Sequence, residues 1–284
     1  MPIVPDQPLA QPAEPAGVSR AAAQSTSALV TGHFGEWLQG RMGPNGPLVL
    51  VTLPCPVLAV YRTAERGDPL PYSDAQLREF YRSLDVEPDH PPEHVSTIPP
   101  GCGAGASTAI LVAIARAIGF EGSPEHLSKA CLAVEGATDP LMYRVPDRLL
   151  WAAREARVVD YLTPPPRAEV VGGYFGAPQR TVAEDTDFPD VSDLILQWRR
   201  ATQQGRLEAL AEIATESAER CRRMRGPEDP MSDLVRETGA LGYARAHTGS
   251  ARALIFTPGR VPETTEAALD DAGLQGVFRF QTRS

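Results

Sequence analysis

The chain has 284 residues, of which 42% are hydrophobic and 22% are charged, and its formal net charge is −9. This composition is typical of a globular protein with one large domain or two modest ones, and no apolar run approaches the length of a membrane span. The negative charge argues against a nucleic-acid partner, because contact with a phosphate backbone needs a basic face. The four cysteines, at positions 55, 102, 131 and 221, form no CxxC pair and suggest neither a zinc site nor a disulfide framework. We therefore expect a cytoplasmic protein that binds neither nucleic acid nor a membrane.

Proline-rich segments divide the chain. Residues 1–26 contain five prolines and many alanines, with no basic segment ahead of an apolar core. We expect a disordered tail there rather than a signal peptide. A triple proline within residues 163–167 predicts a linker between an N-terminal domain, 27–164, and a C-terminal domain, 165–284.

Apolar spacing and turn residues predict the elements of these two domains. Strands and helices mix without strict alternation, which indicates an α+β fold. In chain order the predicted elements are strands at 27–30, 48–51 and 57–61, a helix at 75–84, a strand at 94–98, a helix that begins at 107 and stops at 119, a helix at 124–134, a strand at 168–175, helices at 192–203, 206–224 and 231–238, strands at 242–247 and 252–257, a helix at 262–272, and a strand at 276–280.

The most informative segment is residues 99–109, which read Pro-Pro-Gly-Cys-Gly-Ala-Gly-Ala-Ser-Thr-Ala and continue into an apolar helix. Three alternate glycines let the backbone N–H groups point one way, and they leave no Cβ to keep an anion at a distance. Ser107 and Thr108 lie where the helix begins, and the first N–H groups of a helix lack partners. The segment therefore predicts a phosphate-binding loop. The alternative is a glycine-rich turn capped by Ser107.

Two common phosphate loops do not fit this segment. A Walker A loop needs a lysine after its last glycine, whereas Lys129 is the sole lysine of the chain. Gly101, Gly103 and Ala106 satisfy the dinucleotide fingerprint, which would make the chain an NAD-binding oxidoreductase. That fold needs a second strand before an acidic residue, and the stretch ahead of Glu121 leaves no room for one.

The loop resembles the phosphate loop of the GHMP kinases (galactokinase, homoserine kinase, mevalonate kinase and phosphomevalonate kinase), whose pattern is P-x-x-x-G-L-G-S-S-A. Ala104 and Ala106 depart from this pattern, at the leucine and at the first serine. The residues that match are Pro99, Gly103, Gly105, Ser107 and Ala109.

Other segments resemble one GHMP branch, the L-threonine kinases of cobalamin synthesis and propanediol metabolism, and they occur in the order of that family. Residues 32–40 are similar to its C-G-E-hydrophobic-x-Q-G signature, with Phe34 in place of the cysteine. Residues 135–139 resemble the E-P-T-D segment of that branch but are one residue longer. Residues 171–174 resemble the strand that enters its second half. Residues 246–251 resemble its A-H-S-G-T motif. The signature residues that match are Gly35, Glu36, Gln39 and Gly40.

The resemblance implies an α+β fold with a ribosomal S5 domain 2-like N-terminal domain, a ferredoxin-like C-terminal domain and a site in the cleft between them. It also implies ATP and Mg²⁺ as cofactors. The residues expected to bind the ATP phosphates are Pro100, Gly101, Cys102, Gly103, Ala104, Gly105, Ala106, Ser107 and Thr108.

The resemblance further assigns Ser107 and Glu135 to Mg²⁺, and Ser107 and Asp139 to catalysis, with Asp139 as base or orienter of the acceptor hydroxyl. The spacing of four would place Glu135 and Asp139 on one helical face, although Gly136 and Pro140 argue against a continuous helix there. The alternative for Glu135 is an exposed carboxylate at the end of a helix. The alternative for Asp139 is that it caps the segment 140–143.

The expected substrate residues come from the first and last motifs, and Glu36 would pair with the ammonium group of an amino acid. For Glu36 and Gln39 the alternative is a structural turn. For His247 the alternative is a histidine at the end of a strand that is hydrogen-bonded to the backbone. Trp37 and Trp151 are expected in the core. The expected substrate residues are Glu36, Gln39, His247, Thr248, Gly249 and Ser250.

The leading hypothesis is an ATP-dependent kinase that converts L-threonine to O-phospho-L-threonine for cobalamin biosynthesis. A GHMP kinase for another small alcohol, such as homoserine, is the first alternative. The second is a nucleotide-binding protein that has lost catalysis, because Cys102 stands where the branch has lysine and Ala106 replaces a serine. The partner in the leading hypothesis is a small-molecule substrate, an amino acid that carries an alcohol group, and a homodimer is possible.

Overall fold

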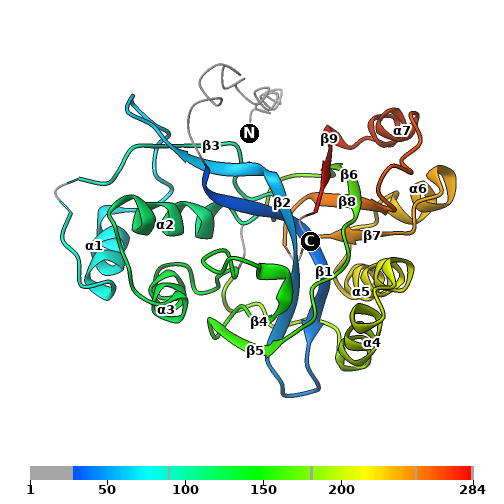
Figure 1. The fold of residues 1–284 in the computed structure, drawn as a ribbon, viewed down its shortest axis with the longest axis horizontal. Coiled ribbons are helices and arrows are strands. Elements are labelled where there is room, and N and C mark those ends of the chain that lie inside the picture. Colours follow the sequence, from blue (N-terminus) through cyan, green and yellow to red (C-terminus); the bar gives the residue numbers. More distant parts are fainter. Residues whose placement is uncertain (1–27, 89, 180–181, 247, 283–284) are drawn as a thin grey trace, which may run out of the picture.

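The computed structural model describes residues 28–88, 90–179, 182–246 and 248–282. The predicted tail at 1–26 and the predicted substrate residue His247 therefore lie outside the described residues. The described residues form one nine-stranded sheet with helices at both ends of the molecule (Figure 1). None of the described helices is both long and apolar enough to cross a membrane.

The sheet runs through both halves of the chain. Its strands follow the order β5-β4-β2-β1-β7-β8-β6-β9, with β3 paired to β2, and each named pair is antiparallel. Glu36 of β1 pairs with Arg245 of β7, so a strand of the first predicted domain adjoins one of the second. The division into 27–164 and 165–284 stays a prediction. The strands are β1 (Ala28–Arg41), β2 (Leu48–Arg62), β3 (His94–Ser96), β4 (Leu149–Ala152), β5 (Arg157–Tyr161), β6 (Glu169–Tyr174), β7 (Gly242–Arg245), β8 (Ala251–Phe256) and β9 (Gln275–Gln281).

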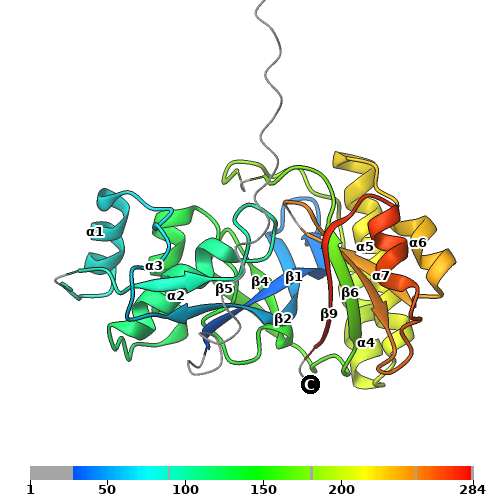
Figure 2. The same ribbon diagram turned by 90° about the horizontal axis from the view of Figure 1, so that it is seen from above.

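The helices form two groups, with α1, α2 and α3 at one end of the molecule and α4, α5, α6 and α7 at the other (Figures 1 and 2). α2 packs against β1 and β2, and α5 packs against β1 and β7, so β1 lies between the two groups. The helices are α1 (Asp74–Ser83), α2 (Ala106–Ala117), α3 (Pro124–Glu135), α4 (Ser192–Gln203), α5 (Leu207–Arg225), α6 (Met231–Thr238) and α7 (Thr265–Asp271).

Two predictions for the first hairpin are wrong. β1 extends to Arg41 rather than ending at residue 30, and β2 is one strand through Pro54 rather than two separate strands. A strand tolerates a proline where a bulge interrupts the regular ladder. The β1–β2 register shifts on both sides of His33, which lies opposite Pro54. The motif at residues 32–40 therefore lies within a strand.

Most other predicted elements are confirmed to within a few residues. The hairpin of β4 and β5 was not predicted, because its strands are short and β4 is buried without alternation. Trp37 and Trp151 are fully buried, which confirms that both belong to the core. The apolar helix after the glycine loop is also confirmed, since residues 108–115 of α2 are all buried.

Candidate active site

The loop between β3 and α2 holds three glycines in the left-handed region. The φ angles are 72° at Gly101, 73° at Gly103 and 76° at Gly105, a conformation that glycine adopts at little cost. Gly105 is the N-cap of α2, and among the described residues no side chain caps that helix. The alternative of a turn capped by Ser107 is therefore wrong. The first N–H groups of α2 remain available to an anion, as a phosphate site requires.

Backbone hydrogen bonds from two strands hold this loop in place. The amide of His33 on β1 donates to the carbonyl of Ala104 over 3.2 Å, and the amide of Ala251 on β8 donates to the carbonyl of Cys102 over 2.9 Å. Both bonds come from strands of the central sheet, so the loop is fixed relative to the sheet as well as to α2.

The segment 248–250 packs directly on the glycine loop. A Cβ on Gly103 would lie 2.2 Å from the carbonyl oxygen of Thr248, and a Cβ on Gly249 would lie 2.5 Å from the amide nitrogen of Gly103. Such distances are too short for any other residue without movement of the backbone. The structure thus brings three predicted substrate residues, Thr248, Gly249 and Ser250, against the predicted phosphate loop.

Glu135, the last residue of α3, turns its carboxylate toward the start of α2. The Thr108 hydroxyl donates to Oε2 over 2.8 Å, and the Tyr72 hydroxyl donates to Oε1 over 3.2 Å. Burial raises the pKa of Glu135 to about 7, although hydrogen bonds from Ser107 and Thr108 oppose the rise. This arrangement does not fit the alternative of an exposed carboxylate at a helix end. Tyr72 was not predicted.

Asp139 joins the same cluster through its backbone. Its amide donates to the Thr108 hydroxyl over 3.3 Å. Gly136 ends α3 in the left-handed conformation, so Glu135 and Asp139 do not share a helical face. Residues 140–143 form a turn rather than a helix, closed by the Tyr143 amide donating to the carbonyl of Pro140 over 3.1 Å. Thr108 is therefore the residue that holds the two carboxylate-bearing segments together.

His33 also belongs to this cluster and, like Tyr72, was not among the predicted site residues. Its side chain is 3% exposed, with Nε2 lying 3.3 Å from Asp139 Oδ2 and Nδ1 lying 3.5 Å from Glu36 Oε1. Burial lowers the pKa of His33, but the charges of Glu36 and Asp139 outweigh it and raise the value to about 9. Burial also raises the pKa of Glu36 to about 8, against the attraction of His33.

The two predicted substrate residues on β1 lie in the interior. The side-chain Nε2 of Gln39 donates to the carbonyl of Arg245 over 3.3 Å, and the backbone N–H of Gln39 donates to the Ser217 hydroxyl of α5 over 2.9 Å. Among the described residues, Glu36 Oε2 and Gln39 Oε1 are buried without a hydrogen-bond partner. The packing of β1 against β7 explains why the motif has a glycine at position 35, because a Cβ there would lie 2.8 Å from the backbone of Arg245. These positions belong to a strand, so the alternative of a structural turn is wrong.

A strap, defined as the described residues between β6 and α4, borders the glycine loop. The amide of Gln179 donates to the carbonyl of Gly101 over 2.7 Å. Arg154, from the β4–β5 hairpin, donates to the carbonyl of Asp185 over 3.4 Å, and Arg225 of α5 pairs with the Asp185 carboxylate. Neither arginine was predicted, because no local motif marks either residue.

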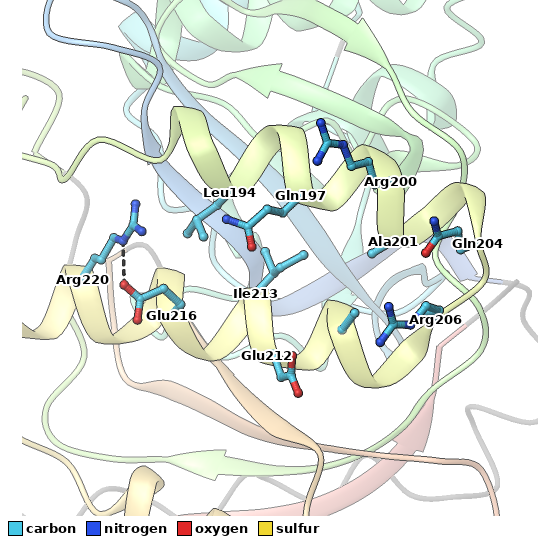
Figure 3. A pocket seen from close by; sticks show the side chains of 11 residues that line it. Leu194, Gln197, Arg200, Ala201, Gln204, Arg206, Glu212, Ile213, Glu216 and Arg220 are labelled. Atoms are coloured by element: carbon cyan, nitrogen blue, oxygen red, sulfur yellow. Dashed lines mark hydrogen bonds and ion pairs between the residues drawn. The ribbon is translucent and has the colours of Figure 1, made fainter.

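A separate groove of about 440 Å³ lies between α4 and α5 (Figure 3). Charged side chains of both signs line it, and Arg220 pairs with Glu216 across 2.8 Å. None of the predicted site residues lines this groove. The described candidate site is therefore the cluster around the glycine loop.

The fold is that of the GHMP kinases, which confirms the predicted fold class. Over most of its length the chain is similar to L. major mevalonate kinase in complex with R-mevalonate (14% identity, TM-score 0.56, 91% of this chain and 97% of that chain covered). It is also similar to Streptococcus pneumoniae phosphomevalonate kinase (11% identity, TM-score 0.59, 91% of this chain and 99% of that chain covered). A third similar structure is the homoserine kinase of Cytophaga hutchinsonii (14% identity, TM-score 0.51, 89% of this chain and 93% of that chain covered). No protein-family model and no curated protein matches the sequence.

Proposed function

We propose that the protein is an ATP-dependent kinase that phosphorylates a small alcohol, with L-threonine as the leading substrate. The product would be O-phospho-L-threonine, used in cobalamin biosynthesis. The observation that carries this proposal is the contact of Thr108, in the first turn of α2, with Glu135 and Asp139. The Thr108 hydroxyl bonds to the carboxylate of Glu135 and to the backbone amide of Asp139, which supports a role for both acidic residues next to a glycine loop whose N–H groups can receive phosphate.

The residues around the loop suit the phosphates of ATP and a magnesium ion. Backbone N–H groups of residues 101–107 would bind the phosphates, and Mg²⁺ would be held by Ser107 and Glu135. Both residues offer the hard oxygen atoms that Mg²⁺ prefers, and burial of Glu135 makes a cationic partner favourable. When bound, Mg²⁺ neutralises negative charge on the transferred phosphoryl group.

Asp139 would act on the acceptor hydroxyl. Its side chain is 24% exposed while that of His33 is 3% exposed, so Asp139 is the member of this pair that a substrate can reach. We propose that its carboxylate orients the hydroxyl and accepts the proton as the oxygen attacks phosphorus. The neighbouring His33 would hold this carboxylate in position through its Nε2 atom.

Glu36 supports an acceptor that carries an ammonium group. A buried carboxylate oxygen without a partner among the described residues favours a cationic ligand, because an unsatisfied buried acceptor is costly. This favours an amino acid such as threonine, serine or homoserine over mevalonate. Gln39, Thr248, Gly249 and Ser250 stay proposed substrate residues beside it.

The test is ADP release by the purified protein with ATP, Mg²⁺ and a panel of threonine, serine, homoserine and mevalonate. We expect threonine-dependent turnover that is lost in Ser107→Ala and retained in the matched variant Ser232→Ala on α6. Turnover only with another alcohol would reassign the substrate. ATP binding without turnover on any alcohol would indicate a nucleotide-binding protein without kinase activity, and the absence of ATP binding would overturn the proposal.

A further inference from the structure

We propose that His33, Glu36 and Asp139 form a binding site for a divalent transition-metal ion such as Zn²⁺. The three side chains each offer one ligand atom, and these atoms all lie within 4.8 Å of one another. One imidazole nitrogen with two carboxylate oxygens is a donor set that suits zinc and related ions, whereas Mg²⁺ favours oxygen donors. The site is separate from the oxygen ligands proposed for Mg²⁺ at Ser107 and Glu135.

The orientation of His33 is that of a metal-ligating histidine. Its Nδ1 lies 3.3 Å from the carbonyl oxygen of Gly35, so it can donate its proton to the backbone. A metal-bound histidine commonly makes such a bond from its other ring nitrogen, which fixes the tautomer and the direction of the ring. The bond leaves Nε2 as the ligand atom, on the side of the ring that faces Asp139.

One ligand atom of this cluster is buried and unsatisfied. Glu36 Oε2 lies on a residue that is 3% exposed and has no hydrogen-bond partner among the described residues, whereas His33 Nε2 faces Asp139 Oδ2 across 3.3 Å. Buried polar atoms are almost always satisfied by protein or by a bound group. A metal ion held between the three side chains would satisfy Glu36 Oε2 and would balance the charge of the two carboxylates.

The backbone keeps the three donors together. His33 and Glu36 come from one strand, and the register shift between them brings their side chains to one place. Gly105 permits the close approach of the ring, because a Cβ there would lie 2.6 Å from His33 Cδ2. Three protein ligands would leave a coordination position for an oxygen atom of a ligand or of water. A metal ion on Glu36 excludes an ammonium group there, so ion and acceptor would compete.

Calorimetric titration of the chelator-treated full chain with Zn²⁺ tests the site, and Co²⁺ gives a visible spectrum that reports ligand geometry. We expect one ion per chain, bound in the presence of excess Mg²⁺. Loss of a residue that only hydrogen-bonds to a metal ligand weakens metal binding by about 10–100-fold. His33→Gln and Glu36→Gln each remove a proposed ligand itself, so each should weaken Zn²⁺ binding by about tenfold or more. His94→Gln, which removes another buried histidine outside the cluster, should leave the affinity unchanged.

Circular dichroism and thermal unfolding establish that each variant is folded. If His33→Gln or Glu36→Gln does not fold, Asp139→Asn replaces it, because the Asp139 side chain is partly exposed. The proposal is overturned if the wild-type chain shows no saturable binding, or if folded variants bind Zn²⁺ and Co²⁺ as tightly as the wild type. The three side chains would then form an ion-pair network only. Either result leaves the kinase proposal intact, since that is tested by Mg²⁺-dependent turnover.

Discussion

The Nε2 atom of His33 on β1 lies 3.3 Å from the Oδ2 atom of Asp139, which follows α3. This contact connects the central strand of the sheet with the helical segment that contains the second carboxylate of the site. Gly105 of the phosphate loop lies against the same imidazole ring. The three parts of the candidate site therefore meet at His33, a residue that no catalytic motif singled out.

The variant Asp139→Asn tests the carboxylate that faces the acceptor. A positioned general base contributes about 10²–10⁴-fold to a rate, and we expect a loss of kcat in this range with a smaller change in KM for ATP. Steady-state kinetics measures both values, and Asp233→Asn on the exposed surface of α6 serves as the matched control. Unchanged kcat would show that Asp139 neither accepts the proton nor orients the hydroxyl.

The variant Gly103→Ala tests the packing of the phosphate loop on the segment 248–250. The new Cβ would lie 2.2 Å from the carbonyl oxygen of Thr248, so the loop must move and ATP binding should be lost. The matched control is Gly259→Ala, where φ is 74° but no atom lies within 4 Å among the described residues. The control variant should lower the free energy of unfolding by about 1–2 kcal/mol, because alanine is strained in the left-handed conformation, and it should leave ATP affinity unchanged. Isothermal titration with ATP and urea unfolding measure the two effects, and equal ATP affinity in both variants would contradict the predicted contact.

The variant Thr108→Val tests the hydroxyl that joins Glu135 to the backbone of Asp139. Its removal leaves a buried carboxylate oxygen without this donor, which costs about 1–3 kcal/mol of unfolding free energy. We also expect a higher Mg²⁺ requirement, because Glu135 loses its orientation. Thr202→Val on α4, whose hydroxyl bonds only to carbonyl groups of its own helix, is the control for stability. A Mg²⁺ requirement unchanged from wild type would argue against Glu135 as a metal ligand.

Glu219 on α5 predicts a specific loss of stability in acid. Burial alone would raise its pKa, but hydrogen bonds from Arg222, Ser232 and Tyr243 outweigh this and lower the value from 4.5 to about 2. A carboxyl group whose pKa is depressed by folding stabilises the protein above its unfolded pKa, and the contribution is lost as the pH falls through its folded pKa. We therefore expect the free energy of unfolding to fall by up to about 3 kcal/mol between pH ~4.5 and pH ~2.

This acid dependence is measured by urea unfolding across that range of pH. Glu219→Gln should be less stable at neutral pH and should show a flatter decline in acid than the wild type. Glu208→Gln, an exposed residue at the start of the same helix, is the control and should follow the wild-type profile. A decline equally steep in Glu219→Gln would assign the acid loss to other carboxylates.

Local sequence patterns were sufficient for the glycine loop and for the helix after it. Left-handed glycines and an apolar helix depend on residue type and on short-range periodicity, so Gly101, Gly103 and Gly105 could be recognised without any tertiary information. The fold class followed from the same kind of pattern, together with the resemblance to the GHMP kinases. The Pro-rich β2 strand could not be predicted, because its continuity depends on bulges in the pairing with β1.

The residue pattern alone was enough to locate the loop of left-handed glycines, and the family resemblance was enough to predict that Glu135 and Asp139 belong near it. The contacts of Thr108 with these two segments, and the position of His33 between Glu36 and Asp139, become visible in the folded chain and not before. In a regular strand His33 and Glu36 would face opposite sides, because side chains alternate with a period of two. A register shift in the β1–β2 pairing removes that alternation, and such a shift depends on the partner strand rather than on the residues of β1 alone.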